Sequence, residues 1–113
     1  MSAVEQFTRA HLVTDSPDEF PVVPVALRYD PEADPRAVRV GLPGSGEWVV
    51  DRELLERGLR VPAASGDVSV WPCGRVQTVM EFHSPQGVSV IQLDASTVIR
   101  FLRQTHAATP VPR

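Results

Sequence analysis

"RVQTVMEFHSPQGVSVIQLDASTVIRFLRQTHA", residues 75–107, is the stretch that decides the fold. Residues 75–83 alternate in the manner of a strand. "SPQG" (84–87) has proline second and glycine fourth, which is the preference of a type I turn. Residues 87–93 are a second strand, so the two should pair as an antiparallel hairpin. One face of the first strand is expected to carry Val76, Thr78, Met80 and Phe82.

A helix is predicted directly after this hairpin, over residues 95–107. Asp94 stands where an N-cap residue belongs. The apolar positions recur at the spacing of a helix with one buried face. That face is expected to contain Ala95, Val98, Ile99, Leu102 and Thr105.

Before the hairpin, "SGDVSVWP" (65–72) indicates a turn and a third strand. Gly66 and Asp67 open the turn, and a strand over 67–71 follows. Pro72 has no N–H to donate, so we expect it to end this strand beside Trp71.

Farther toward the N-terminus, "DRELLERG" (51–58) predicts a short helix. Asp51 is a good N-cap, and Gly58 is expected at the C′ position with a left-handed φ. Because helices of two turns are marginal alone, Leu54 and Leu55 should pack against a sheet.

The remaining N-terminal segments also suggest strands. Residues 4–13 fit a strand or a short helix, and 22–29 fit a strand that Pro24 places at an edge or an entry position. Residues 36–42 and 47–50 flank "PGSG", a hairpin-like connection. The fold class predicted is α+β, with a largely antiparallel sheet and two helices, as one domain over 1–108 and a Pro-rich tail over 109–113.

Composition excludes several classes of protein. The 113 residues are 42% hydrophobic and carry a net charge of −3, with all 11 basic residues arginine. A nucleic-acid-binding protein usually has a basic excess. The N-terminus lacks the pattern of a signal peptide, and no apolar segment is long enough to span a bilayer, so we expect a cytoplasmic protein.

No set of residues with catalytic spacing is evident. Glu81 and His83 share a strand face and could ligate a metal, but a solvated face is the simpler interpretation. Cys73 lacks an adjacent base that would lower its pKa. We therefore expect no enzymatic activity, no cofactor and no metal, which favours a binding or scaffolding domain.

The strand aromatics leave an alternative open. Trp48, Trp71 and Phe82 could stack unpaired bases, as on sheets that bind single strands. Core positions are favoured for Trp48 and Phe82. For Trp71, a core position and a position that contacts a partner are equally compatible with the sequence. Single-stranded nucleic-acid binding is thus the alternative function.

Five phrases resemble the SsgA-like family of actinobacteria in the family's order: "VPVALRYDPEADPRAV" (24–38), "EWVVDRELLERGL" (47–59), "SGDVSVWP" (65–72), "SPQGVSVI" (84–91) and "FLRQT" (101–105). The residues taken as the structural signature are Leu27, Arg28, Tyr29, Asp30, Trp48, Leu54, Leu55, Gly58, Gly66, Asp67, Trp71 and Pro72.

The resemblance implies a non-enzymatic regulator of sporulation-linked cell division, located at septa. It implies a curved antiparallel sheet similar to the whirly single-strand-binding proteins, assembled as a trimer, and the exposed edge expected at 22–29 would suit such pairing. The implied partners are the tubulin-like division GTPase FtsZ, other SsgA-like proteins and membrane-associated division proteins, so that membrane contact would come only through partners. We expect the partner-binding charges on the first helix and just beyond it: Arg52, Glu53, Glu56, Arg57 and Arg60.

Overall fold

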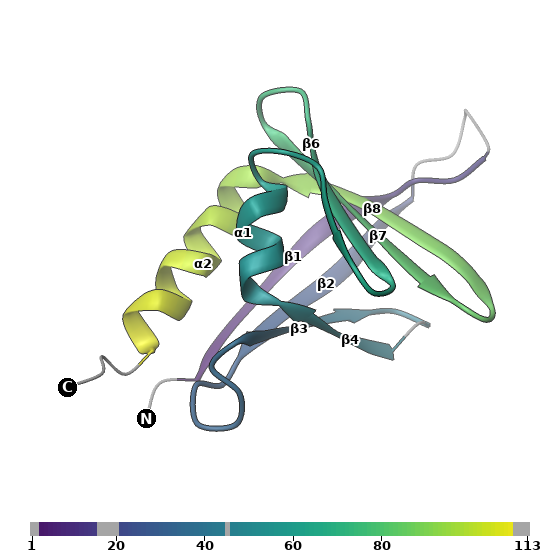
Figure 1. Cartoon of the computed structure of the whole chain (residues 1–113). Helices are drawn as coiled ribbons and strands as arrows, with labels where there is room; N and C mark the ends of the chain where they lie inside the picture. Colours follow the sequence, from purple (N-terminus) through teal and green to yellow (C-terminus); the bar gives the residue numbers. More distant parts are fainter. Residues whose placement is uncertain (1–2, 16–20, 45, 110–113) are drawn as a thin grey trace.

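The computed structural model describes residues 3–15, 21–44 and 46–109. Eight strands form one curled antiparallel sheet in the order β4-β3-β2-β1-β8-β7-β6-β5, and two helices accompany it (Figure 1). The α+β class predicted from the sequence is therefore confirmed. The elements are β1 (Val4–Leu12), β2 (Val22–Tyr29), β3 (Ala37–Leu42), β4 (Gly46–Asp51), α1 (Arg52–Gly58), β5 (Ala63–Ser65), β6 (Val68–Cys73), β7 (Gln77–Ser84), β8 (Gly87–Asp94) and α2 (Ala95–Ala108).

The β7–β8 hairpin has the expected register, with Ser84 opposite Gly87 across the turn. Strand β7 begins later than predicted, so Val76 precedes it and is 66% exposed. Thr78, Met80 and Phe82 are buried as expected. Val79, on the opposite face, is also buried, so the outer face of this strand is partly covered.

Pro72 does not end its strand, and that prediction is wrong. Strand β6 continues through Pro72 and Cys73, which pair with Thr78 and Gln77 of β7. On its other side β6 pairs with β5 only up to Val70. A proline is tolerated beyond that point because its missing N–H can face the open side. The sequence had indicated a loop where the short β5 lies.

Strand β2 is an interior strand, so of the two positions predicted from Pro24 the edge is wrong and the entry position is confirmed. It pairs with β1 on one side and with β3 on the other. Pro24 lies near its entry, opposite Arg9 of β1, whereas the pairing with β3 begins only at Ala26. The same physical reason applies as at Pro72. The sheet edges are β4 and β5.

Residues 4–12 form a strand and not a short helix. Strand β1 joins the two halves of the sheet, because its end pairs with β8 through His11–Gln92 and Leu12–Ile91. The predicted loop between β1 and β2 falls mostly on residues 16–20, which lie outside the described residues.

Helix α1 begins as predicted and ends differently. The Asp51 carboxylate accepts a hydrogen bond from the Glu53 N–H at 2.9 Å. Gly58 is the last helical residue and has no positive φ, so the predicted left-handed C′ role is wrong. A Cβ on Gly58 would lie 2.3 Å from Cγ1 of Val70. The glycine is needed for the close approach of α1 to β6.

Helix α2 presents a face rotated from the predicted one. Its buried residues are Val98, Phe101, Leu102 and Thr105, whereas Ile99 is 37% exposed and Ala95 is half-buried. Asp94 occupies the N-cap position but its side chain makes no capping bond. It accepts a hydrogen bond from Nε2 of Gln77 instead, at 2.8 Å.

One hydrophobic core lies between the sheet and the helices. It includes Leu27 of β2, Leu55 of α1, Phe82 of β7 and Phe101 of α2. Trp48, on the edge strand β4, lies 5.1 Å from Phe82 between ring centroids, at 37°. The curl of the sheet therefore brings its two ends together around a shared core and leaves the outer surface of α1 free.

Candidate interaction surface

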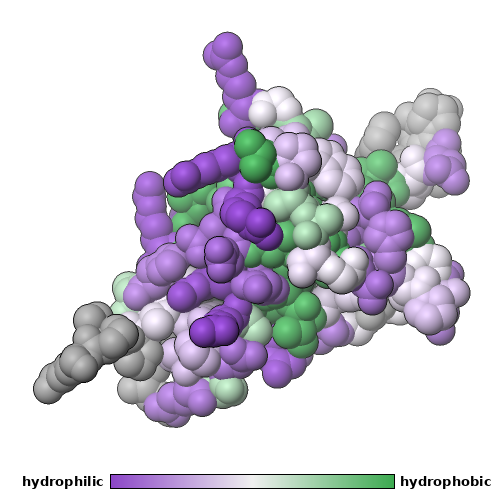
Figure 2. All heavy atoms as spheres, viewed as in Figure 1, coloured by the Kyte–Doolittle hydropathy of each residue, from purple (hydrophilic) through white to green (hydrophobic). Residues whose placement is uncertain are grey.

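The exposed side of α1 carries the charges predicted for partner binding, here called the α1 face: Arg52, Glu53, Glu56, Arg57 and Arg60. Leu54 and Leu55 point into the core, as expected from the sequence, at 2% and 0% exposed. Hydrophilic side chains dominate the region over the helices in Figure 2, with hydrophobic ones visible between them. The packing of these two leucines in the core therefore fixes the position of the α1 face.

Arg52 is half-buried and is hydrogen-bonded to residues outside α1. Its Nη1 donates to Oγ1 of Thr109 at 2.7 Å and to the hydroxyl of Tyr29 at 3.2 Å. The Tyr29 and Thr109 oxygens are 2.6 Å apart, and the guanidinium lies 5.3 Å from the Tyr29 ring centroid. These contacts fasten the end of α2 to α1 and β2, so we assign Arg52 mainly to structure.

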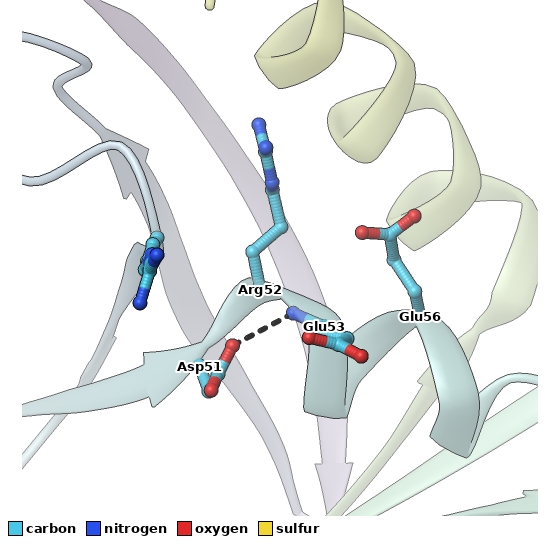
Figure 3. A pocket seen from close by; sticks show the side chains of 5 residues that line it. Asp51, Arg52, Glu53 and Glu56 are labelled. Carbon is cyan, nitrogen blue, oxygen red and sulfur yellow. Dashed lines mark hydrogen bonds between the residues drawn. The ribbon is translucent and has the colours of Figure 1, made fainter.

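A charged hollow of about 510 Å³ lies beside the start of α1. It combines three carboxylates with two guanidiniums. Figure 3 shows Arg52 and Glu56 projecting on the side where α2 runs, with Asp51 bonded to the Glu53 backbone. The lining residues are Arg36, Asp51, Arg52, Glu53 and Glu56.

A second hollow, about 380 Å³, lies between α1 and α2 and is here called the interhelix groove. Glu56 and His106 approach to 3.0 Å across it. The α2 side of this groove was not predicted from the sequence, because the helical spacing places Ile99 in the core. The spacing of residues 99, 102, 103 and 106 as one helical stripe could have found it. The groove is lined by Glu56, Leu59, Arg60, Ile99, Leu102, Arg103 and His106.

The signature residues divide by burial. Five are buried: Leu27, Tyr29, Leu54, Leu55 and Gly58. Three are half-buried: Trp48, Trp71 and Pro72. The others are exposed: Arg28, Asp30, Gly66 and Asp67. Gly66 has a φ of +59° and so makes the predicted turn, while Oδ1 of Asp30 accepts from the Glu32 N–H at 3.0 Å. Most of the signature therefore maintains the fold.

The outer face of the sheet carries an ion-pair network around Arg28. Its guanidinium contacts Glu5 at 2.6 Å and Glu47 at 3.1 Å, and Arg39 contacts Glu47 at 3.3 Å. Hydrogen bonds from Glu5 first, then Glu47, raise the pKa of Arg28 above its ordinary value. Arg28 also lies 5.9 Å from the ring centroid of the exposed Phe7. Because these pairs are exposed, they contribute little to stability.

The residues considered for metal chemistry are not gathered into a metal site. Glu81, which is half-buried, and His83, which is exposed, pair with each other at 2.5 Å on the outer face of β7. Within the described residues no group of three or more His, Cys, Asp or Glu side chains could hold a metal ion. Cys73 is exposed. Neither helix in the described part of the chain combines the length and apolar character needed to cross a membrane.

The comparisons with known proteins agree with one another. A family model described as "Streptomyces sporulation and cell division protein, SsgA" matches residues 23–113. The sporulation-specific cell division protein SsgB of Streptomyces coelicolor is 40% identical over 106 residues, 88% of this chain and 76% of that protein. SsgB of Frankia casuarinae is 40% identical over 99 residues, 79% of this chain and 68% of that protein.

Two solved structures have the same fold. One comes from work on SsgB mutations that correlate with longitudinal cell division during sporulation of Streptomyces coelicolor. It has a TM-score of 0.84 at 34% identity and covers 96% of this chain and 90% of its own. The SsgA-like sporulation-specific cell division protein of Thermobifida fusca has a TM-score of 0.82 at 26% identity, with 97% and 84% covered.

Proposed function

Because the chain belongs to the SsgA family of sporulation and cell division proteins, with SsgB-type relatives, we propose that it is a non-enzymatic adaptor that brings FtsZ to sporulation septa. A role in sporulation-linked division follows from the family. Recruitment of FtsZ and the absence of catalysis are the parts proposed. The observation that carries the proposal is that the α1 face presents exposed charges on a helix whose opposite side is packed in the core.

Rigidity of that surface supports an adaptor role. The two leucines under α1 are buried, and Gly58 lets the helix lie directly on β6. A surface that is already ordered loses little conformational freedom on binding. Within the α1 face, Glu53, Arg57 and Arg60 are exposed, so their charges are available to a partner.

The charged hollow at the start of α1 adds to this surface. Its mixed carboxylates and guanidiniums can form complementary pairs with a partner, which favours specificity and rate of association more than affinity. A contact of this kind suits an adaptor that must release its partner after division.

The test is a pull-down of purified FtsZ from the same host by wild-type protein and by Arg57→Glu. Arg57 is exposed, so its replacement should leave the fold intact. Arg75→Glu serves as a matched control, because Arg75 is exposed in the turn between β6 and β7, away from α1. We expect FtsZ capture by wild type and by the control, and weaker capture by Arg57→Glu. Unchanged capture by Arg57→Glu discards the α1 face, and no capture by wild type discards the partner.

We also propose that the protein assembles as a trimer and is located at septa. The β2 edge that had favoured pairing is interior, so the proposal of a trimer is supported by the family alone. Light scattering coupled to gel filtration tests it directly. A monomer at micromolar concentration would contradict the assembly.

Single-stranded nucleic-acid binding, the alternative from the sequence, is not carried forward. Phe82 is fully buried and Trp48 is half-buried against it, so the structure favours core positions for both, as expected from the sequence. Anisotropy of labelled single-stranded DNA at low salt would reveal any binding that remains.

A further inference from the structure

The interhelix groove combines an apolar floor with cationic sides. Leu102 is 5% exposed and Leu59 is half-buried, while Ile99 is 37% exposed at the rim. The volume of about 380 Å³ is enough for one or two side chains of a bound segment. An exposed isoleucine in a hollow between two helices is suited to contact an apolar side chain.

The basic side chains of the groove are one histidine, which is hydrogen-bonded to Glu56, and two arginines. Glu56 and His106 satisfy each other at 3.0 Å. Arg60 and Arg103 are exposed, and neither forms an ion pair with any described residue. The two guanidiniums outnumber the one carboxylate of the lining, so the groove carries local positive charge in a molecule whose net charge is −3.

We infer that the interhelix groove binds a short acidic peptide segment of a partner protein, with one apolar side chain on Ile99 and Leu59 and carboxylates on Arg60 and Arg103. The inference rests on the proposed adaptor function and adds the chemistry of the segment that is recognised. Guanidinium groups suit carboxylates because they offer donors in a planar fork.

Two other occupants fit less well. A nucleic-acid backbone presents a continuous row of phosphates, and an apolar hollow with two arginines does not supply the run of cations that such a backbone requires. A membrane surface is contacted by protruding basic and apolar side chains, whereas Leu59 and Leu102 lie recessed between the helices. A peptide side chain can enter the groove.

The experiment is a titration of the isotope-labelled full chain, followed by amide chemical shifts. The probe is a synthetic peptide of glutamates around two leucines. Two matched peptides replace either the leucines by serine or the glutamates by lysine. The double variant Arg60→Glu/Arg103→Glu removes the proposed contacts, and Arg100→Glu reverses a single charge on the exposed side of α2 outside the groove. Thermal unfolding verifies that each variant is folded.

We expect shifts confined to residues around 59–60 and 99–106, and an affinity for the acidic peptide that falls at least about tenfold in the double variant but little in Arg100→Glu. The serine and lysine peptides should both bind more weakly. Absence of shifts at millimolar peptide, equal binding of the lysine peptide, or equal loss in Arg100→Glu would overturn the inference. The inference would also be overturned if single-stranded DNA or phosphatidylglycerol vesicles changed the amide chemical shifts of the groove residues and the acidic peptide did not.

The groove inference and the adaptor proposal can fail separately. If wild-type protein captures FtsZ and the double variant captures it equally, the groove inference fails and the adaptor proposal stands. If the groove binds the acidic peptide and FtsZ is not captured, the choice of partner fails instead.

Discussion

Gly58→Ala tests how α1 is held against the sheet. In most helix interiors this substitution is stabilising, because alanine has the better helix propensity by about 1 kcal/mol. Here the added Cβ would lie 2.3 Å from Cγ1 and 2.4 Å from Cβ of Val70, which is fully buried. An ordinary contact is more than an ångström longer. We therefore expect the packing cost to exceed the propensity gain.

The expected size follows from these two opposing effects. Forcing an extra methyl group into a packed core costs about 1–3 kcal/mol, and this contact belongs at the severe end because the Val70 carbonyl oxygen also lies 3.0 Å away. After the propensity gain, the free energy of unfolding should fall by about 2 kcal/mol. For a domain of this size that lowers the midpoint of thermal unfolding by roughly 8 °C.

The assay is urea unfolding followed by circular dichroism, with thermal unfolding as a second measurement. Val70→Ala is made alone and together with Gly58→Ala. Because alanine removes the contact with Cγ1 at 2.3 Å but keeps the Cβ at 2.4 Å, Val70→Ala should relieve only a small part of the packing cost, and the two losses should be close to additive. Gly58→Asn should be at least as harmful as Gly58→Ala, since Gly58 has no left-handed φ for asparagine to fit.

A Gly58→Ala variant that is more stable than wild type would refute the close-approach explanation. Better tolerance of asparagine than alanine would restore the C′ role that the sequence had indicated.

Three further predictions concern other parts of the fold. Tyr29→Phe removes the hydroxyl that contacts Arg52 and Thr109, so unfolding free energy should fall by about 1–2 kcal/mol; an unchanged urea midpoint would show that this cluster adds nothing. Gly66→Ala should destabilise by about 1 kcal/mol and Gly66→Asn by less, because φ is +59° and a Cβ meets nothing within 4 Å; equal urea midpoints for the two would contradict this. Arg28→Met should lower the midpoint of thermal unfolding slightly, and only at low ionic strength, because the ion pairs of Arg28 are exposed and screened by salt. A loss of stability that persists in molar salt would indicate a packing effect instead.

Local signals in the sequence predicted most of the elements. The hairpin at 84–87 and the cap at Asp51 depend on nearby residues and were found correctly. Pro24 and Pro72 misled because whether a proline interrupts a sheet depends on where the neighbouring strand ends. That information is in the tertiary pairing and not in the local pattern.

The candidate site was predicted in part for a similar reason. A two-turn helix with two inward leucines indicates an exposed charged side, and the α1 face has that form. The residues of α2 that line the interhelix groove could not be assigned from the sequence. Two neighbouring stripes of that helix are both apolar at the spacing of a buried face. Phe101 is buried and Ile99 is at the rim, an outcome fixed by how α2 packs on β1 and β8.

The central claim is that this chain acts by binding a division protein through its helical face. Biolayer interferometry of purified FtsZ on the immobilised full chain tests it most directly, with the Arg57→Glu variant and the Arg60→Glu/Arg103→Glu variant measured beside wild type. The account predicts saturable binding to wild type that both variants weaken and that Arg75→Glu preserves. No binding of FtsZ to wild type, or equal binding to every variant, would contradict it.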